Sequence, residues 1–201
     1  MRASEDNRGR RGRSRNAALT RQEILRAAQM HFTRYGYDGV GVREIAATVG
    51  VNAALVNRYF GSKEQLFAES FAEGFEFPFD DLLNDRSKAG EVLARAVFAK
   101  EEKDVGENDF DPLLVLLRSA ANARAAGILR EFLDERFIRP LARRLEGEDA
   151  ELRAALIAAY LLGLASMRFV IRSGPLTAEE TERLVAFVAP AVQSYVDGTP
   201  S

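Results

Sequence analysis

Cysteine is absent from the 201-residue sequence, and His31 is its single histidine. The lack of cysteine excludes disulfide scaffolds, thiolate zinc sites, iron–sulfur clusters and thiol catalysis. A single histidine excludes metal sites built from several histidines, so we predict no metal and no cofactor. His31 lies off the apolar stripe of the helix predicted around it, and we assign it no role.

Long hydrophobic runs are also missing, because the longest stretch without a charged residue is the fourteen-residue segment 154–167. A membrane-spanning helix needs about 18 to 20 apolar residues. The N-terminal segment 1–16 is charged and lacks the apolar region of an export signal. We therefore expect a soluble, cytoplasmic protein without a membrane partner.

Charge is distributed unevenly along the chain. Residues 1–70 carry 12 basic and 7 acidic side chains, whereas residues 71–201 carry 16 basic and 23 acidic ones. The net charge of −2 thus combines an excess of +5 in the first third with −7 in the rest. An asymmetry of this kind indicates contact between one part of the chain and nucleic acid or a membrane surface.

Segment 6–16 consists of Arg, Gly, Ser, Asn and Asp, with no apolar side chain. Such a composition cannot bury surface to offset the entropy of ordering, so residues 1–17 are predicted to be a disordered basic arm. The arm would neutralise DNA phosphates or enter a minor groove. The alternative is a solubilising tail. The arginines of the arm that would contact DNA are Arg10, Arg11, Arg13 and Arg15.

Apolar residues recur at helical spacing along most of the chain, and we find no alternation typical of strands. Thr20 with Glu23, and Ser62 with Gln65, form capping-box patterns that predict helix starts. Pro140 lies inside a predicted helix or breaks it. The chain is therefore predicted to be all-α with about nine helices, at 20–35, 42–49, 51–60, 62 to about 75, 87–103, 112–126, 126–145, 148–172 and 177–196.

Two of the short predicted helices meet at Gly50, the first being the segment VREIAATV at 42–49. Ala46 leaves room for close approach of the helices, and Gly50 permits the positive φ of a sharp turn. Val51 and Val56 would fill the space between them. This pattern is typical of a helix-turn-helix, whose second helix reads the major groove of DNA.

Four motifs lie within residues 20–67: F-x-x-x-G-Y from Phe32, V-R-E-I-A from Val42, the Gly50–Val51 turn, and Y-F-x-S-K-E-x-L-F from Tyr59. In this combination they resemble the DNA-binding domain of the TetR family of bacterial transcriptional regulators. The resemblance implies an N-terminal three-helix helix-turn-helix DNA-binding domain at 18–65. It also implies a larger C-terminal helical domain at 66–201 for effector binding and dimerisation.

The resemblance further implies which side chains contact double-stranded DNA. The chain departs from the family pattern at Gly41, Asn52, Leu55 and Asn57, where Ser, Thr or Tyr are common. Asn57 can still form a bidentate pair with adenine, whereas alanines offer only methyl contacts. For some of these residues the alternative is that they do not contact DNA, the charged ones being ordinary solvated side chains and the aromatic ones part of the core. The implied residues are Arg43, Asn52, Ala53, Ala54, Asn57, Tyr59 and Lys63.

The last two predicted helices have wide apolar surfaces, and the run Ala154–Met167 is apolar nearly all round. A helix of this kind must be buried on several sides. The partner surface is either the core of the same domain or a second subunit. The resemblance implies the second, because TetR-like proteins dimerise through their last two helices. The predicted interface residues are Ala158, Leu162, Ala165, Phe169, Leu184, Val188, Val192 and Tyr195.

The resemblance also implies an effector site enclosed by the middle helices. A phenylalanine stripe is more typical of a core than of a pocket, so both readings stay open. An apolar lining would suit a hydrophobic effector of unknown identity, with Arg118 and Asn122 as polar anchors if they point inward. The candidate lining residues are Phe71, Phe75, Phe98, Leu117, Arg118, Asn122, Tyr160 and Leu164.

The sequence thus predicts a ligand-responsive DNA-binding regulator, a homodimeric repressor released from a palindromic operator by a small effector. The alternative is an activator, or a regulator controlled by a protein partner. A helical enzyme is the remote alternative, and we predict no catalytic residues. No glycine-rich phosphate loop follows a strand pattern, and Asp109 and Asp111 lack a second partner for acid–base chemistry.

Overall fold

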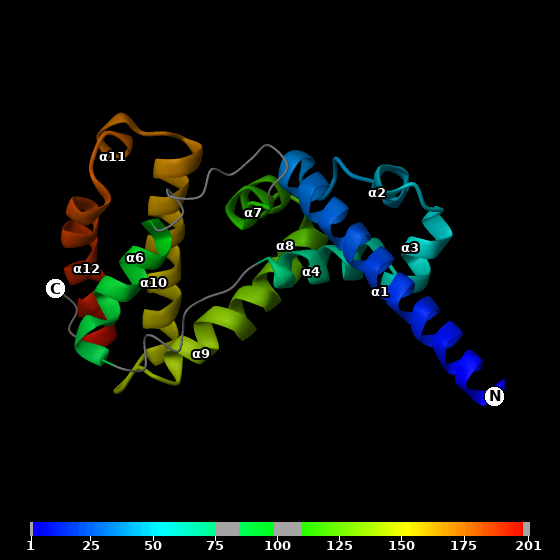
Figure 1. Ribbon diagram of the computed structural model, residues 1–201. Coiled ribbons are helices and arrows are strands. Elements are labelled where there is room, and N and C mark those ends of the chain that lie inside the picture. The colour runs from blue at the N-terminus through cyan, green and yellow to red at the C-terminus, as the bar shows by residue number, and fades with distance from the viewer. Residues whose placement is uncertain (1, 75–84, 99–109, 199–201) are drawn as a thin grey trace. The chain divides into compact units, whose positions relative to one another are not determined.

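A computed structural model describes the backbone of residues 2–74, 85–98 and 110–198, and the side chains from residue 16 onward. These residues are mostly helical and contain no strand, which confirms the predicted all-α class. The chain forms two compact units (Figure 1). Unit 1 comprises residues 1–75 with 106–128, and unit 2 comprises 76–105 with 129–201. The domain boundary predicted after residue 65 stays a prediction, and the described segment 110–128 groups with unit 1.

Unit 1 is built on the long helix α1, against which α2 and α4 pack (Figure 1). Its core is aromatic, with the Phe67 ring centred 4.9 Å from Phe32 and 5.1 Å from Tyr37, both edge-on. All three residues are buried. The helices of the unit are α1 (Arg2–Tyr35), α2 (Val42–Val49), α3 (Ala53–Phe60), α4 (Lys63–Glu73), α7 (Pro112–Ser119) and the first half of α8 (Ala123–Leu133).

Helix α1 starts far earlier than the capping box at Thr20 predicts. The structure continues it back to Arg2, so the segment expected as a disordered arm has a helical backbone. Ala17, Ala18 and Leu19 extend the helical pattern upstream, and arginine is a good helix former in the segment before them. Thr20 is therefore an interior residue of α1 and caps nothing.

Unit 2 packs α6, α10 and α12 side by side around an aliphatic core (Figure 1). Leu93, Ile157 and Val192 are fully buried at its centre. Around this core the elements are η1 (Arg86–Lys88), α6 (Ala89–Phe98), η3 (Asp134–Ile138), α9 (Arg139–Ala142), α10 (Ala150–Ala165), η4 (Ser166–Val170), α11 (Gly174–Thr177) and α12 (Thr181–Asp197).

Two helix boundaries in the second half differ from the sequence-based prediction. A break predicted at Ala126 lies instead at 120–122, where the Asn122 Oδ1 accepts from the N–H groups of Arg124 and Ala125 and starts α8. The predicted cap at Thr177 is also wrong, because its hydroxyl donates to the Ser173 carbonyl and α12 begins at Thr181.

Pro140 neither breaks nor ends its helix. The π-helical segment η3 lies directly before α9, and Pro140 is the second residue of α9. Residues 123–142 thus form one continuous helical stretch of α8, η3 and α9.

Candidate nucleic-acid interface

The turn between α2 and α3 has the geometry that the sequence predicts. Gly50 has φ 74° and ψ 28°, the left-handed conformation that favours glycine. Its N–H donates to the Ala47 carbonyl at 3.1 Å, and the Val51 N–H donates to the Ala46 carbonyl at 2.9 Å. This pair of bonds is a Schellman motif, which ends α2 and directs the chain into α3.

Helix α3 is anchored by two buried side chains, Val56 and Phe60. Ala54, Asn57 and Arg58 are exposed on the rest of its surface. An amphipathic helix that packs on the protein with one face and is exposed on the other suits insertion into a major groove.

Asn52 does not lie free at the start of α3. Its side-chain oxygen accepts a hydrogen bond from the Ala54 N–H at 2.8 Å, so the residue acts as the N-cap. Ala53 and Tyr59 are half-buried. Among the residues predicted from the resemblance on α3 itself, Ala54 and Asn57 are therefore the two exposed ones.

The start of α4 follows the predicted capping box. The Ser62 hydroxyl accepts from the Gln65 N–H at 3.2 Å. The neighbouring Lys63 is half-buried, with its ammonium 4.1 Å from the centre of the Tyr37 ring, a cation–π contact. A cation held at a helix N-terminus with backbone N–H groups is a favourable place for a phosphate.

A network of charges lies beside Lys63. Burial, reinforced by a hydrogen bond to Glu64, raises the pKa of Tyr37 to about 12. Glu64 accepts hydrogen bonds from its own N–H and from Ser62 and Tyr37, which lower the pKa of its carboxyl group. Glu64 also pairs with Arg124 of α8 at 3.4 Å. Tyr37 is thus a neutral donor and Glu64 a carboxylate throughout the physiological pH range.

Two side chains of α1 that sequence reasoning missed make contacts with α2, α3 and α4. His31 Nε2 lies 2.7 Å from the Thr48 hydroxyl, and that hydroxyl donates to the Glu44 carbonyl at 3.1 Å. The Thr48 oxygen therefore accepts from the imidazole N–H. Arg21 pairs with Glu69 and lies 4.7 Å from the centre of the Phe60 ring. A histidine one residue from a core aromatic gives no sequence signal for such a link between α1 and α2.

The other predicted DNA contacts fall outside the recognition helix. Arg43 is exposed on α2. The side chains of the four arm arginines, predicted at positions 10, 11, 13 and 15, lie outside the described ones.

The described candidate effector residues are divided between the two units. In unit 1, Phe71 is buried, Leu117 is exposed, and Arg118 donates to the carbonyls of Thr33 and Arg34. Asn122 caps α8 as described above. Phe75, like Asp109, lies outside the described residues.

The remaining effector candidates belong to unit 2. Phe98 is buried with its ring centre 5.4 Å from the Arg168 guanidinium, Leu164 packs against the core, and Tyr160 is 37% exposed. None of them lines the open groove of about 450 Å³ that lies between α6 and α12.

The predicted dimer residues stay a prediction, and the structure shows where they lie within unit 2. Ala158, Leu184, Val188 and Val192 are buried in the core of unit 2, and Phe169 and Tyr195 pack against that core. Ala158, Leu184, Val188 and Val192 thus contribute to the core of a single chain. Leu162 and Ala165 are half-buried.

The outward face of the same helices is apolar as well. Leu152, Leu156 and Tyr160 recur every four residues along α10 with 59%, 40% and 37% of their surface exposed, and Phe187 on α12 is 71% exposed. The helical stretch Ala150–Val170 has the length and hydropathy of a membrane span. Core helices of globular proteins pass the same test, and one third of its most apolar window is buried in unit 2.

The turn at Gly50, the anchored α3 and the capped α4 define a helix-turn-helix protein of the DNA-binding class. Family comparison makes the assignment specific. Residues 24–70 match the model of bacterial regulatory proteins of the TetR family, and residues 87–196 match the tetracyclin repressor-like C-terminal domain. The chain belongs to the TetR family of bacterial regulators.

Some relatives match over a short stretch of the chain. The regulatory protein RaaS of Mycobacterium tuberculosis is 51% identical over 53 residues, which are 26% of this chain and 24% of that protein. The repressor AcnR of Corynebacterium diphtheriae is 40% identical over 50 residues, 25% of this chain and 26% of that protein. The matched stretch thus spans about a quarter of these relatives.

Other relatives match along most of the chain. The regulator BetI of Agrobacterium fabrum is 29% identical over 90% of this chain and 91% of its own length. A TetR-family regulator from Streptomyces coelicolor is also 29% identical, with a TM-score of 0.59 over 88% of this chain and 94% of that one. Salmonella enterica GusR shares the fold, with 19% identity and a TM-score of 0.60 over 90% of this chain and 95% of that one.

Proposed function

We propose that this chain is a cytoplasmic transcriptional repressor that binds a palindromic operator as a homodimer and leaves it when a small hydrophobic effector binds. The observation that supports this proposal most directly is the amphipathic helix α3. Its buried side chains are Val56 and Phe60, and its exposed ones include Ala54, Asn57 and Arg58. Relatives named as repressors, AcnR and BdcR, support the direction of regulation.

The recognition helix would read few bases directly. The Asn52 side-chain oxygen caps the helix, which leaves the Ala54 methyl for a thymine methyl and the Asn57 amide for an adenine. Phosphate contacts from Arg43, Lys63 and the basic start of α1 would then supply a large share of the affinity.

Base readout is tested on sites selected from random DNA duplexes, with binding of the full chain measured by fluorescence anisotropy. Asn57→Ala should relax preference at one base pair per half-site and weaken binding by about 1–3 kcal/mol per bidentate pair lost. Gln22→Ala, an exposed amide on α1, is the matched control and should change nothing. Failure to enrich any palindromic sequence would overturn the proposed function.

Phosphate contacts are tested separately through the salt dependence of binding. Arg43→Ala and Lys63→Ala should each flatten the slope of log K against log salt by about 0.9. Arg130→Ala, an exposed arginine of α8, should leave the slope unchanged. Deletion of residues 2–16 distinguishes a DNA-binding arm from a solubilising tail, since only loss of an arm lowers the slope.

The proposed homodimer uses the outward apolar face of α10 and α12. Leu152, Leu156 and Tyr160 form an exposed apolar stripe along α10, and the large apolar side chain of Phe187 is exposed on α12. The double variant Leu156→Glu/Phe187→Glu should be monomeric in sedimentation equilibrium at concentrations where the parent is dimeric. Leu117→Glu, a similarly exposed leucine of α7, is the control. A monomeric parent protein would refute the dimer.

Effector response is tested by adding candidate hydrophobic compounds to the protein bound to its selected site. A coupling of about 1–3 kcal/mol would weaken DNA binding roughly 5- to 150-fold. The alternative is an activator or a regulator controlled by a protein partner. The position of the selected site relative to the promoter distinguishes activation from repression, because a repressor site overlaps the polymerase footprint.

A further inference from the structure

The open groove of about 450 Å³ belongs wholly to unit 2, with η1 and α6 as one wall and α12 as the other. The two walls lie side by side and run antiparallel (Figure 1). Between Glu182 and Gln193 the groove follows α12 for about three turns, or roughly 16 Å. The residues that line it are distinct from those of the proposed DNA contacts and the proposed dimer face.

The two walls of the groove are bonded to each other. A Cβ at Gly90 of α6 would lie 2.3 Å from the Ala189 carbonyl oxygen of α12, so the close approach of the helices requires glycine there. The Gly90 N–H donates to Gln193 Oε1 at 2.8 Å, and Gln193 Nε2 donates to the Arg86 carbonyl at 3.1 Å. These contacts fix the shape of the groove within a single chain, which lowers the entropic cost of binding a partner.

Short side chains of α12 line the middle of the groove. Ala186 and Ala189 contribute methyl groups, and Pro190 contributes its ring. Pro190 lies in the interior of α12 and has no N–H, so the Ala186 carbonyl lacks the donor that position 190 of a regular helix supplies. Because Ala186 is exposed, a donor from another molecule can reach this part of the groove. The middle of the groove thus combines a low apolar surface with a backbone acceptor.

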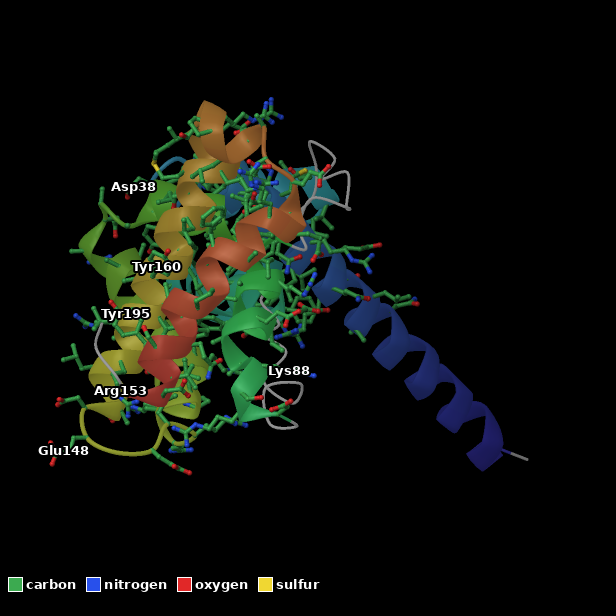
Figure 2. All side chains as sticks on the ribbon, turned by 90° about the vertical axis from the view of Figure 1, so that its left-hand side faces the viewer. Asp38, Lys88, Glu148, Arg153, Tyr160 and Tyr195 are labelled. Atoms are coloured by element: carbon green, nitrogen blue, oxygen red, sulfur yellow. The ribbon has the colours of Figure 1, made fainter. Side chains whose placement is uncertain are left out.

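The two ends of the groove carry opposite charge. At one end Arg95 donates to Glu91 at 3.0 Å and to both carboxylate oxygens of Glu182, so one cation faces two carboxylates. The hydrogen bonds from Arg95 lower the pKa of Glu182, which is therefore ionised at neutral pH. At the other end Lys88 is exposed (Figure 2), with its ammonium 3.7 Å from Asp85, which does not line the groove. The groove is thus negative toward Glu182 and positive toward Lys88.

This shape and this charge pattern fit a helix better than a small molecule. Sites for small molecules enclose most of their ligand, whereas this groove is open to solvent. An amphipathic helix can lay its apolar face into such a groove, and short side chains beneath it let its backbone approach. The positive N-terminus of a helix is stabilised near the Glu182 end, and its negative C-terminus near Lys88.

We propose that the groove between α6 and α12 docks an amphipathic helix of a protein partner, about three turns long and parallel to α12. Apolar side chains spaced three or four residues apart contact Ala186, Ala189 and Pro190, and a polar side chain among them donates to the Ala186 carbonyl. This surface goes beyond the proposed function and does not depend on it.

The partner helix is identified by cross-linking in the cells that produce the protein. The photoreactive amino acid p-benzoylphenylalanine replaces Ala186 or Lys88, one on each wall of the groove, in the full chain. The same replacement of Ala123, an exposed alanine at the start of α8, is the matched control. Mass spectrometry of the cross-linked products should give the same segment of one partner protein from both groove positions and not from position 123. That segment should carry apolar residues at helical spacing.

A synthetic peptide with the sequence of that segment is then titrated with the full chain by fluorescence anisotropy. Ala186→Arg should weaken its binding about tenfold or more, because a long side chain fills the middle of the groove. Lys88→Glu should weaken it by a factor that shrinks as the salt concentration rises. Ala123→Arg should leave the affinity unchanged.

Three outcomes would overturn the docking surface. They are the absence of a cross-link from both groove positions, a cross-link to a second copy of this chain or to a segment without helical apolar spacing, and equal peptide affinities for the parent and Ala186→Arg. None of them depends on DNA binding, whose absence would instead overturn the proposed function.

Discussion

Replacement of Arg153 by methionine removes a buried guanidinium from the C-terminal end of α12. Arg153 is 8% exposed, and it donates to the carbonyls of Glu146, Glu148, Tyr195 and Val196, the last three at 3.1, 3.0 and 3.2 Å (Figure 2). The side chain thus joins the loop before α10 to the last turn of α12. Methionine keeps most of the apolar stem, so the variant isolates the loss of the charged donors.

The structure sets the magnitude of the effect. The Val196 carbonyl keeps a second donor, Arg86 at 3.2 Å, and the loop carbonyls of the exposed Glu146 and Glu148 can be hydrated. The Tyr195 carbonyl loses its donor, and a hydrogen bond from a charged group contributes about 1.5–3 kcal/mol. A partly buried cation at a helix C-terminus adds up to ~2 kcal/mol. We expect a loss of about 3 kcal/mol in the free energy of unfolding.

Urea unfolding followed by circular dichroism at 222 nm, at one fixed protein concentration, measures this loss. Arg183→Met is the control, because the exposed Arg183 forms a surface pair with the half-buried Glu179, and surface pairs contribute less than about 1 kcal/mol. Arg153→Lys keeps the charge but lacks the several N–H donors of the guanidinium. Its loss in the free energy of unfolding should therefore lie between the losses for Arg153→Met and Arg183→Met. A loss for Arg153→Met no larger than that for Arg183→Met would refute the capping role.

Three further predictions concern unit 1. Gly50→Ala should cost about 1–2 kcal/mol in urea unfolding from the left-handed backbone alone, because nothing lies within 4 Å of the added Cβ; an unchanged midpoint would contradict this. Ser62→Ala should cost about 1 kcal/mol through loss of the α4 cap, with amide exchange of the first turn as readout. Burial lowers the folded-state pKa of His31 below 6.5, so its contribution to stability is present above pH 6.5 and lost as pH falls through the folded pKa. NMR titration of the imidazole checks the pKa, and His31→Gln should remove that pH dependence.

Local sequence signals predicted the helix-turn-helix well. Gly50 has the positive φ expected of it, Ser62 and Gln65 form the expected cap, and the helix-ending glycines Gly36 and Gly61 also have positive φ. These features depend on residues within four positions of one another, so the chain needs no distant partner to specify them. The Asn122 cap was an available signal of the same kind that periodicity alone overlooked.

Contacts between distant residues could not be predicted in this way. Ser119 bonds to a backbone N–H 82 positions earlier, and Arg118 bonds to carbonyls some 85 positions earlier. Neither side chain carries a motif, and both were assigned to the effector-binding part of the chain. Their partners bring α7 into the DNA-binding unit, which composition and spacing do not indicate.

By itself, the sequence determined the all-α class, the recognition turn and the family, because helical period, capping residues and a glycine with positive φ are local properties. The tertiary structure decided which side of α10 is core and which is free. The run Ala154–Met167 is apolar on nearly every side, so its pattern cannot select a face. Packing against α6 and α12 buries Ile157 and Ala158 and leaves Leu156 and Tyr160 outward.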